Sequence, residues 1–486
     1  MITALILVPT LAAALCFATR SRPLRDAWLV GTAVCHAALV GVLAFERPAP
    51  TPGAWLGLDD LGLLFLIPVS ALFLAVAVYT VGYLRREPDQ PHGDLEEGFL
   101  FTNEPHSAFA GCLLLFLATM SLVTASRHLG LLWVAVEGTT LASAPLIYFH
   151  RHHRSLEATW KYMLVCSVGI GFALLGNLAL VGAAAGAASA SLGLDDLLAT
   201  APQLDRDWLE AALLLFLVGY GTKMGLAPMH TWLPDAHSEA PSPVSALLSG
   251  ALLACAFLGI LRAQQVLGAA GAAELGAAPL RVFGLVSMAV GALLIVRQPD
   301  YKRMLAYSSV EHMGIAALGV GIGGTAVFGA MLHIISHAFA KAALFLVAGN
   351  LLARYASKQA ERVRGALAVQ PRSAALWIAG LLAIAGMPPF ALFLSELTIL
   401  RAAVETQPWL AGAFLTLLAV AFAAMLAAGL PMALGRAPAG IPRAPEPASA
   451  LWPPALLAVA LLALGLHLPA PLRALLEGAS RALGGG

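Results

Sequence analysis

Three polar residues recur at every fourth position of one apolar segment: His333, His337 and Lys341 in MLHIISHAFAKAALFL. The spacing i, i+4, i+8 places the three side chains on one face of a helix, over a rise of about 12 Å. Histidine changes charge near neutral pH, and a lysine removed from water gives up its proton more readily. The pattern therefore predicts a path for protons along a buried helix, in preference to three unrelated hydrogen bonds between helices.

Other chemistry is less well supported by the sequence. Histidines at i and i+4 can bind zinc, but no glutamate follows His333 in an H-E-x-x-H pattern and no third ligand is evident. The five cysteines lie in apolar runs without C-x-x-C spacing, which argues against iron–sulfur ligation. The loop containing His230, Asp235, His237 and Glu239 is an alternative place for an active site. We predict no metal site, no bound cofactor and no catalytic residue of the chain's own.

Further ionisable residues lie inside apolar segments, where lipid makes charge costly and function is the default hypothesis. They are Glu137, Lys223, Glu311, His312 and Glu396. Two of them stand beside breaks in the helical pattern, because Gly225 and Pro228 follow Lys223, and Gly386, Pro388 and Pro389 precede Glu396. Paired discontinuous helices next to charges are typical of ion sites in transporters with inverted repeats.

The elements that must position these residues are membrane helices. Hydrophobic residues make up 59% of the 486 residues and charged residues only 11%, whereas soluble domains carry about 25% charge. Fourteen apolar segments of the length that a bilayer requires can be counted: near residues 2–19, 27–45, 60–84, 107–125, 129–149, 159–184, 209–229, 243–261, 280–296, 304–322, 326–350, 374–400, 409–434 and 451–468. The sequence therefore predicts an all-α, polytopic membrane protein with about 14 transmembrane helices.

Charge distribution predicts the orientation of the chain and excludes one class of partner. Most of the 28 basic residues fall in the odd-numbered loops between these segments, and basic loops favour the cytoplasm. Both termini are therefore expected outside, with the first apolar run retained as a helix. The 28 basic and 27 acidic residues nearly cancel, and no basic stripe with aromatic residues is present, so no nucleic-acid partner is expected.

Several long runs of the sequence resemble one known family. They are KMGLAPMHTWLPDAHSEAPSPVSALLSG (Lys223–Gly250), DYKRMLAYSSVEHMGIAALG (Asp300–Gly319), HIISHAFAKAALFLVAGNL (His333–Leu351), and GLLWVAVEGTTLASAPLIYFHR with SLEATWKYMLVCSVGIG, both within Gly130–Gly171. These runs resemble the antiporter-like proton-translocating subunits of respiratory complex I, Mrp-type cation/proton antiporters and membrane-bound hydrogenases. The chain looks most similar to the component F branch of the hydrogenase-4 type, over about residues 60 to 430.

The resemblance implies a fold with two inverted five-helix repeats and broken helices 7 and 12. We expect an N-terminal region with helices 1–3 and a cytoplasmic loop (1–106), a first repeat (107–265), a second repeat (266–434), and a proline-rich linker with helix 14 and an amphipathic tail (435–486).

The resemblance also implies roles for individual residues. Glu137 and Lys223 match a gating ion pair, and Glu396 matches a residue near the proton exit. His312, His333, His337 and Lys341 match the groups that connect them. Many relatives carry a lysine in helix 8 where this chain has Ala254, so that protons must cross there through water, or through His230 or His237, or coupling is weaker.

The function implied is a proton-translocating subunit without a redox centre, in a membrane oxidoreductase of the hydrogenase-4 or formate-hydrogenlyase type. Expected partners are other membrane subunits, a soluble redox arm with [NiFe] and iron–sulfur subunits, the bilayer, and as the transported ion either protons or sodium. The expected location is the bacterial cytoplasmic (inner) membrane. Alternatives that the residues leave open are a subunit of an Mrp-type cation/proton antiporter and a subunit of a complex I-type NADH:quinone oxidoreductase.

Overall fold

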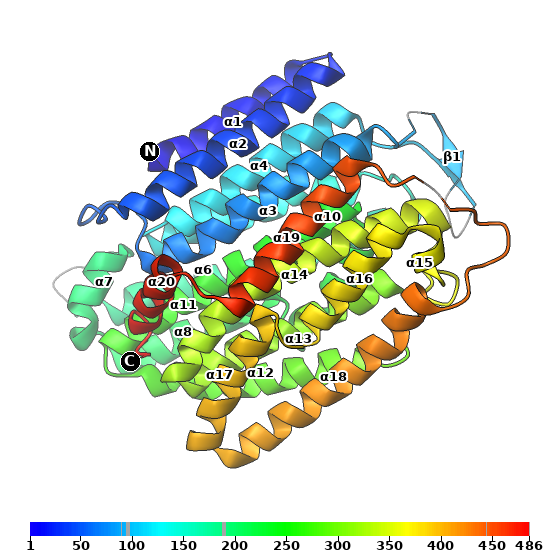
Figure 1. The fold of residues 1–486 in the computed structure, drawn as a ribbon. Helices are drawn as coiled ribbons and strands as arrows, with labels where there is room; N and C mark the ends of the chain where they lie inside the picture. Colours follow the sequence, from blue (N-terminus) through cyan, green and yellow to red (C-terminus); the bar gives the residue numbers. More distant parts are fainter. Residues whose placement is uncertain (89, 94–97, 187–190, 444, 486) are drawn as a thin grey trace.

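The computed structural model describes residues 1–88, 90–93, 98–186, 191–443 and 445–485. Helices account for nearly all regular structure in these residues (Figure 1). Those up to the first break are α1 (Ile2–Ala18), α2 (Arg22–Glu46), α3 (Asp60–Leu84), α4 (His106–Ala125), α5 (Leu129–Ile147), α6 (His153–Ala183), α7 (Leu194–Thr200) and α8 (Arg206–Met224). A short hairpin, β1 (His92–Gly93) with β2 (Leu100–Phe101), occupies the polar loop after α3.

The remaining helices include two short ones after α8, followed by the second half of the bundle. They are α9 (Leu233–Glu239), α10 (Ser242–Leu247), α11 (Leu253–Ala269), α12 (Ala273–Ile295), α13 (Tyr301–Ile322), α14 (Thr325–Tyr355), α15 (Ala366–Val369), α16 (Pro371–Ile384), α17 (Ala391–Thr406), α18 (Pro408–Leu434), α19 (Ala448–Leu466) and α20 (Ala470–Arg481). A π-helical turn at Leu248–Leu252 joins α10 to α11.

The all-α polytopic architecture is confirmed, whereas the count of fourteen spans is not. Eleven helical segments of the described residues are long and apolar enough to cross a bilayer. Of the other predicted spans, α1 has 17 residues, α16 and α17 have 14 and 16, and α13 carries four polar residues in its middle. Those four are Ser308, Ser309, Glu311 and His312. The difference therefore comes from the short length of α1, from the break that divides α16 from α17, and from the polar residues that lower the hydropathy of α13.

Both predicted helix breaks are present. Helix α8 ends at Met224, and a 3-10 turn at Met229–Trp232 leads into α9. Helix α16 ends at Ile384, and six residues separate it from α17, which begins at Ala391. Gly225 and Gly386 both have positive φ, at 85° and 67°, a conformation that favours glycine and ends a helix.

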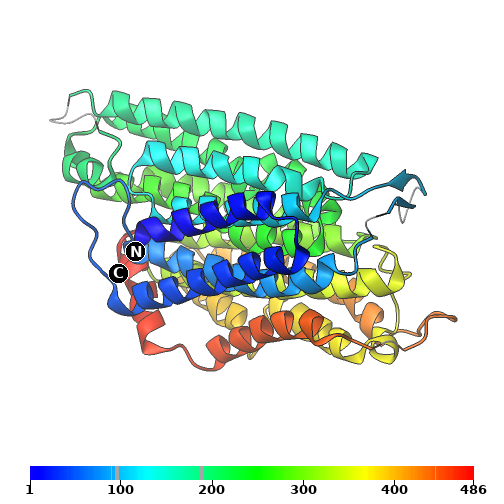
Figure 2. The same ribbon diagram turned by 90° about the horizontal axis from the view of Figure 1, so that it is seen from above.

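Helix α14 is the central element of the bundle. Its apolar core window is completely buried, and it packs against α13, α16, α17, α19 and α10. The N- and C-termini lie at one end of the bundle, which we call the terminal end (Figures 1 and 2). The β1–β2 hairpin lies at the other, which we call the hairpin end (Figure 1).

Candidate functional site

The break after α8 positions Lys223 in the interior. The left-handed conformation of Gly225 ends the helix two residues after the lysine, and a Cβ there would overlap the Leu233 side chain. Ending a helix frees carbonyl groups. The indole Nε1 of Trp232 donates to one of these, the Thr222 carbonyl, at 2.8 Å. The break is therefore closed by hydrogen bonds, with Lys223 in the last turn before it.

The fully buried Lys223 ammonium is held by two hydroxyl groups. Its Nζ donates to Thr140 Oγ1 and to Tyr162 Oη, both at 2.7 Å, and lies 4.5 Å from the centroid of the tyrosine ring. The Thr140 hydroxyl in turn donates to Glu137 Oε2 at 3.1 Å. Glu137 is only half-buried and accepts a second bond from Ser167 Oγ at 2.7 Å. Thus Thr140 connects the lysine to the glutamate that sequence analysis paired with it.

A second hydroxyl chain begins at Tyr162. Ser143 Oγ lies 2.6 Å from the Thr139 carbonyl and donates to it, so it must accept from the Tyr162 hydroxyl, 2.7 Å away. Tyr162 Oη itself accepts from Lys223. These bonds fix the ammonium from two sides and leave it surrounded by groups that can both give and take a proton.

The second cluster joins α13, α14 and α17 through histidines. His312 Nδ1 lies 3.0 Å from His333 Nε2, and His333 Nδ1 lies 2.9 Å from Ser395 Oγ. Because Ser395 Oγ donates to the Leu392 carbonyl at 2.7 Å, it accepts from His333 Nδ1–H. In neutral His333 the lone pair is then on Nε2, so His312 Nδ1–H is the donor to it. The bonds therefore run in one direction from His312 to α17.

The other two polar groups of α14 continue this cluster. The His337 ring lies 5.3 Å from the His312 ring and 6.5 Å from the His333 ring, centroid to centroid. Its Nε2 is buried and has no hydrogen-bond partner among the described residues. One turn further, Lys341 Nζ donates to the Leu305 carbonyl at 2.5 Å and makes a short bond to Ser308 Oγ. The predicted polar face of this helix is thus present and buried.

Glu396 adds a carboxylate to His312 and His333. It lies in α17, the helix that begins after the second break. It is 7% exposed, and its Oε1 has no hydrogen-bond partner among the described residues. A Cβ on Gly386 would overlap its Oε2, so the glycine makes room for the carboxylate. One ligand atom each from His312, His333 and Glu396 lie within 4.8 Å of one another, all buried, which makes this the place where a cation could be held.

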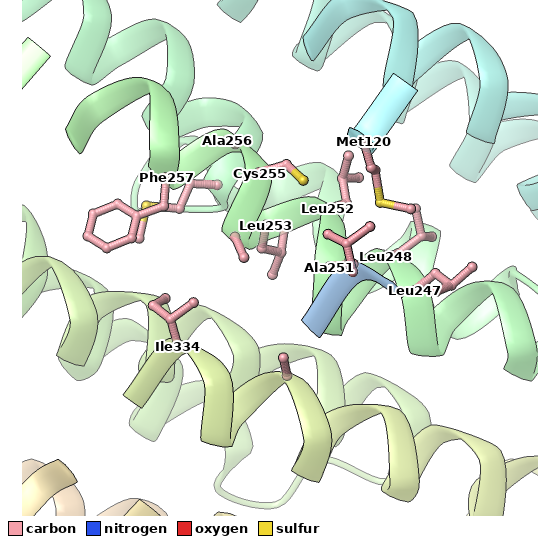
Figure 3. Close-up of a cluster of buried hydrophobic side chains, with 14 of the residues drawn as sticks. Met120, Leu247, Leu248, Ala251, Leu252, Leu253, Cys255, Ala256, Phe257 and Ile334 are labelled. Carbon is pink, nitrogen blue, oxygen red and sulfur yellow. The ribbon is translucent and has the colours of Figure 1, made fainter. Parts of the chain in front are cut away.

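An apolar region lies between the Lys223 cluster and the α14 cluster. Most side chains labelled in Figure 3 are hydrocarbon, among them Leu252 of the π-helical turn, Leu253 and Phe257 of α11, and Ile334 of α14, whereas Cys255 of α11 carries a thiol. Ala254 is also buried there, just after the π-helical turn. Between Leu253 and Phe257 of α11, the buried thiol of Cys255 is the only side-chain group with an exchangeable proton.

Of the two histidines proposed to bridge the region, His237 is the better placed. It is fully buried, its ring lies 5.9 Å from that of Trp232 and 6.0 Å from that of Phe345 on α14, and both ring nitrogens lack a partner among the described residues. His230 is only half-buried, and its ring lies 6.5 Å from that of Tyr307. His237 therefore lies between the break and α14, where buried unpaired nitrogens call for internal water.

A cavity of about 350 Å³ opens at the hairpin end close to His237. Its wall includes Glu239, whose two carboxylate oxygens each accept from Lys358 Nζ at 2.8 Å. It also includes Glu87, which lies 3.4 Å from His150 Nε2. Burial alone would raise the pKa of Glu87, but its interactions with His150, together with hydrogen bonds from Tyr83 and Asn103, lower it to about 2. Charged groups thus line an opening towards the interior.

Sequence analysis missed the hydroxyl groups that connect the ionisable residues. Thr140, Tyr162, Ser308 and Ser395 each bond directly to a predicted site residue. Serine, threonine and tyrosine occur throughout membrane helices, so the presence of a hydroxyl group alone does not identify a functional residue. Thr140 stands three residues after Glu137, and Ser395 next to Glu396, and this proximity is the one clue the sequence offers.

Comparison with known proteins gives a consistent set of matches. Residues 126–427 match the family described as NADH:quinone oxidoreductase/Mrp antiporter, transmembrane. The chain is 34% identical to a hydrogenase-4 component F homolog of Methylacidiphilum infernorum over 414 residues, which is 84% of this chain and 83% of that one.

Solved structures share the fold over the whole chain. A chain of respiratory complex I from Thermus thermophilus with bound NADH is 27% identical, with a TM-score of 0.82 and complete coverage of both chains. A chain of the membrane-bound sulfane sulfur reductase, an archaeal respiratory membrane complex, has a TM-score of 0.87 at 22% identity and covers 100% of this chain and 98% of that one. The second match speaks for the fold alone.

Proposed function

The chain belongs to the NADH:quinone oxidoreductase/Mrp antiporter transmembrane family, and we propose that it translocates protons as a subunit of a membrane oxidoreductase of the hydrogenase-4 or formate-hydrogenlyase type. As an antiporter-like subunit it works with other membrane subunits. The similarity to the hydrogenase-4 component F homolog over most of both chains supports the finer assignment. The soluble arm with [NiFe] and iron–sulfur subunits, the bacterial inner membrane and the outside position of both termini are parts of this proposal.

The observation that carries the proposal is the presence of two buried proton-exchanging clusters on either side of His237. Lys223 has hydroxyl groups around it and a carboxylate beyond Thr140. On α14, His333 and His337 lie within a chain of rings and hydroxyl groups that ends at Ser395. Buried ionisable groups are costly in a membrane protein, and two such clusters aligned through one bundle are best explained by proton movement.

In this mechanism, Glu137 responds to the rest of the complex. It is half-buried at the surface of the bundle, where a neighbouring subunit can reach it, and Thr140 links it to Lys223. When the negative charge of Glu137 is drawn away, the protonated Lys223 loses a favourable interaction and gives its proton towards His237 through water. When the charge returns, Lys223 takes up a new proton.

The α14 cluster then carries the proton towards the terminal end. A proton that reaches His337 passes to His312 and on to His333, whose Nε2 is the acceptor in the neutral chain. Glu396 receives it near a cavity of about 680 Å³ whose wall includes Leu397 and Thr398, the next two residues of α17. Lys341, on the other side of His337, sets the charge of the cluster and holds the proton back when it is itself protonated.

The alternative functions use the same interior residues. A subunit of an Mrp-type cation/proton antiporter would be driven by the proton gradient, and a subunit of a complex I-type NADH:quinone oxidoreductase by another electron donor. The complete coverage of the complex I chain from Thermus thermophilus supports keeping the latter as the second candidate. The division into two inverted repeats at residues 107–265 and 266–434 likewise remains a proposal.

Co-purification tests the assignment. The chain is tagged in its native host, extracted in a mild detergent, and its partners are identified by mass spectrometry. Recovery of a nickel–iron subunit with iron–sulfur subunits is the expected result. Recovery of NADH-oxidising subunits would replace the hydrogenase assignment with the complex I type, and recovery of small membrane subunits alone would contradict a redox-driven pump.

A further inference from the structure

Two consecutive helices and a third one further along the chain bring together the ligands that sequence analysis could not find for a metal. His312 comes from α13, His333 from α14 and Glu396 from α17. One ligand atom of each lies within 4.8 Å of the others, and the three residues are 2%, 0% and 7% exposed. His337, which stands four residues after His333 on the same helix, is not the second ligand. The histidine of a different helix takes that place.

The environment of His333 orients it as a metal ligand. Its Nδ1–H donates to Ser395 Oγ, which is itself held by the Leu392 carbonyl. In metal sites, an imidazole commonly donates its second N–H to an oxygen of the protein, which fixes the ring and leaves the other nitrogen free to bind. Here that other nitrogen is Nε2, and it points to His312 Nδ1 at 3.0 Å.

The carboxylate supplies an unsatisfied acceptor at the same place. Glu396 Oε1 is buried without a hydrogen-bond partner among the described residues, a costly state for an oxygen that can carry charge. The His337 Nε2 beside the cluster is in the same condition. A cation bound between the imidazoles and the carboxylate would satisfy Glu396 directly, and His337 is near enough to approach it.

The donor set indicates which cation fits. Two imidazole nitrogens with one carboxylate oxygen match zinc sites that keep a fourth position open, whereas calcium and magnesium prefer oxygen alone. Zinc–nitrogen bonds of about 2.0–2.1 Å place two ligand nitrogens roughly 3.3 Å apart in a tetrahedron, so the two rings need to part by only a few tenths of an ångström. His312 must also move its proton from Nδ1 to Nε2.

We propose that His312, His333 and Glu396 form a binding site for a divalent transition metal of the zinc class. Leu397 and Thr398, the two residues after Glu396 on α17, line a cavity of about 680 Å³ at the terminal end. None of the three ligands lines this cavity, but it is the side from which we expect a metal to approach. A metal bound to the three ligands occupies the nitrogens that pass protons. The bound metal should therefore inhibit proton translocation. This expected inhibition rests on the proposed function, whereas metal binding itself does not.

Binding is tested with cobalt(II) as the probe on the intact, purified complex after treatment with a chelator and with no electron donor present. A tetrahedral site gives a visible d–d absorption band that saturates at one Co²⁺ per chain and is lost on addition of Zn²⁺. Glu396→Gln and His333→Gln should each lower the Co²⁺ affinity at least about tenfold. Glu396→Gln keeps the size of the side chain, and blue-native electrophoresis shows that each variant complex is assembled.

His36→Gln is the matched control. His36 is also a buried histidine, held between Ser70 and Ser121 at 2.9 Å from each, but it lies in α2, outside the cluster. Its replacement should leave the cobalt band unchanged. The proposal is wrong if no saturable band appears, if Glu396→Gln leaves the affinity unchanged, or if the band disappears only when His150 at the hairpin end is replaced.

Transport separates this site from the proposed function. If the chain carries protons, Zn²⁺ should slow proton translocation over the same concentration range in which it displaces Co²⁺. A complex that shows the Glu396-dependent band but has no proton translocation to inhibit would overturn the proposed function and leave the metal site supported.

Discussion

Removal of the Thr140 hydroxyl should slow proton transfer at Lys223 more than any other change of similar size. Thr140→Val keeps the shape of the side chain but removes both the acceptor for Lys223 Nζ at 2.7 Å and the donor to Glu137 at 3.1 Å. A hydrogen bond to a charged group contributes about 1.5–3 kcal/mol, and 1.36 kcal/mol of barrier corresponds to a factor of ten in rate. Proton translocation should therefore fall by about 10- to 160-fold.

The assay uses the intact complex reconstituted in liposomes, with proton uptake followed by a pH-sensitive dye and electron transfer measured in parallel. Thr140→Ser is the matched control because it retains the hydroxyl group, and it should keep most of the translocation. If the valine and serine variants translocated protons at the same rate per electron, the Thr140 link between Glu137 and Lys223 would have no role.

Three further changes test other parts of the structure. Asp59 caps α3 and accepts from Arg262 at 2.5 and 2.8 Å. Burial alone would raise the pKa of Asp59, but Arg262, with the Gly62 N–H and Arg127, lowers it to about 2. The stabilisation of the fold by the Asp59 carboxylate is therefore complete above about pH 4 and is lost as the pH falls through about 2. Asp59→Asn should lower the stability in detergent by about 2 kcal/mol at pH 7 and remove this pH dependence, as thermal unfolding from pH 7 to 2 would show. Ser395→Ala removes the acceptor for His333 Nδ1–H, at a cost of about 1 kcal/mol, and should slow proton translocation about fivefold with electron transfer retained. Gly386→Ala imposes a positive φ on alanine, at about 1–2 kcal/mol, and displaces the Glu396 carboxylate, so both thermal stability and translocation should fall.

Controls for two of these changes come from neighbouring parts of the same region. Thr406→Ala removes a hydroxyl of α17 that bonds only to its own helix, at the Ala402 carbonyl, and should leave proton translocation unchanged. Gly412→Ala adds a methyl group inside α18 where no atom lies within 4 Å, and should not lower the stability, because alanine is favoured over glycine within a helix. Equal effects in test and control variants would contradict the specific roles of Ser395 and Gly386. If Asp59→Asn left the acid unfolding curve unaltered, the stabilising role of the Asp59 carboxylate would be contradicted.

The sequence predicts the helices and breaks well because both follow from local chemistry. Runs of apolar residues identify membrane helices, and glycine and proline next to Lys223 and Glu396 identify the two interruptions. The face shared by His333, His337 and Lys341 follows from helical geometry alone, and the structure buries it as expected. The number of spans is less secure, since polar residues inside α13 lower its hydropathy below that of an ordinary membrane helix.

Contacts between distant helices could not be derived in the same way. The sequence offered no third metal ligand because Glu396 reaches His333 only through the packing of α17 on α14. The bridge formed by Thr140 depends on how α5 and α8 are placed relative to one another, which no spacing reveals. The buried position of His237 between Trp232 and Phe345, as opposed to the half-buried position of His230, likewise depends on the path of the chain after the break.

Replacement of Lys223 tests the central claim most directly. In liposomes that contain the intact complex, Lys223→Ala should abolish proton translocation while the complex remains assembled and electron transfer continues at a measurable rate. The account would be contradicted if this variant translocated as many protons per electron as the unmodified complex, because the proton would then pass through the membrane without the buried ammonium group.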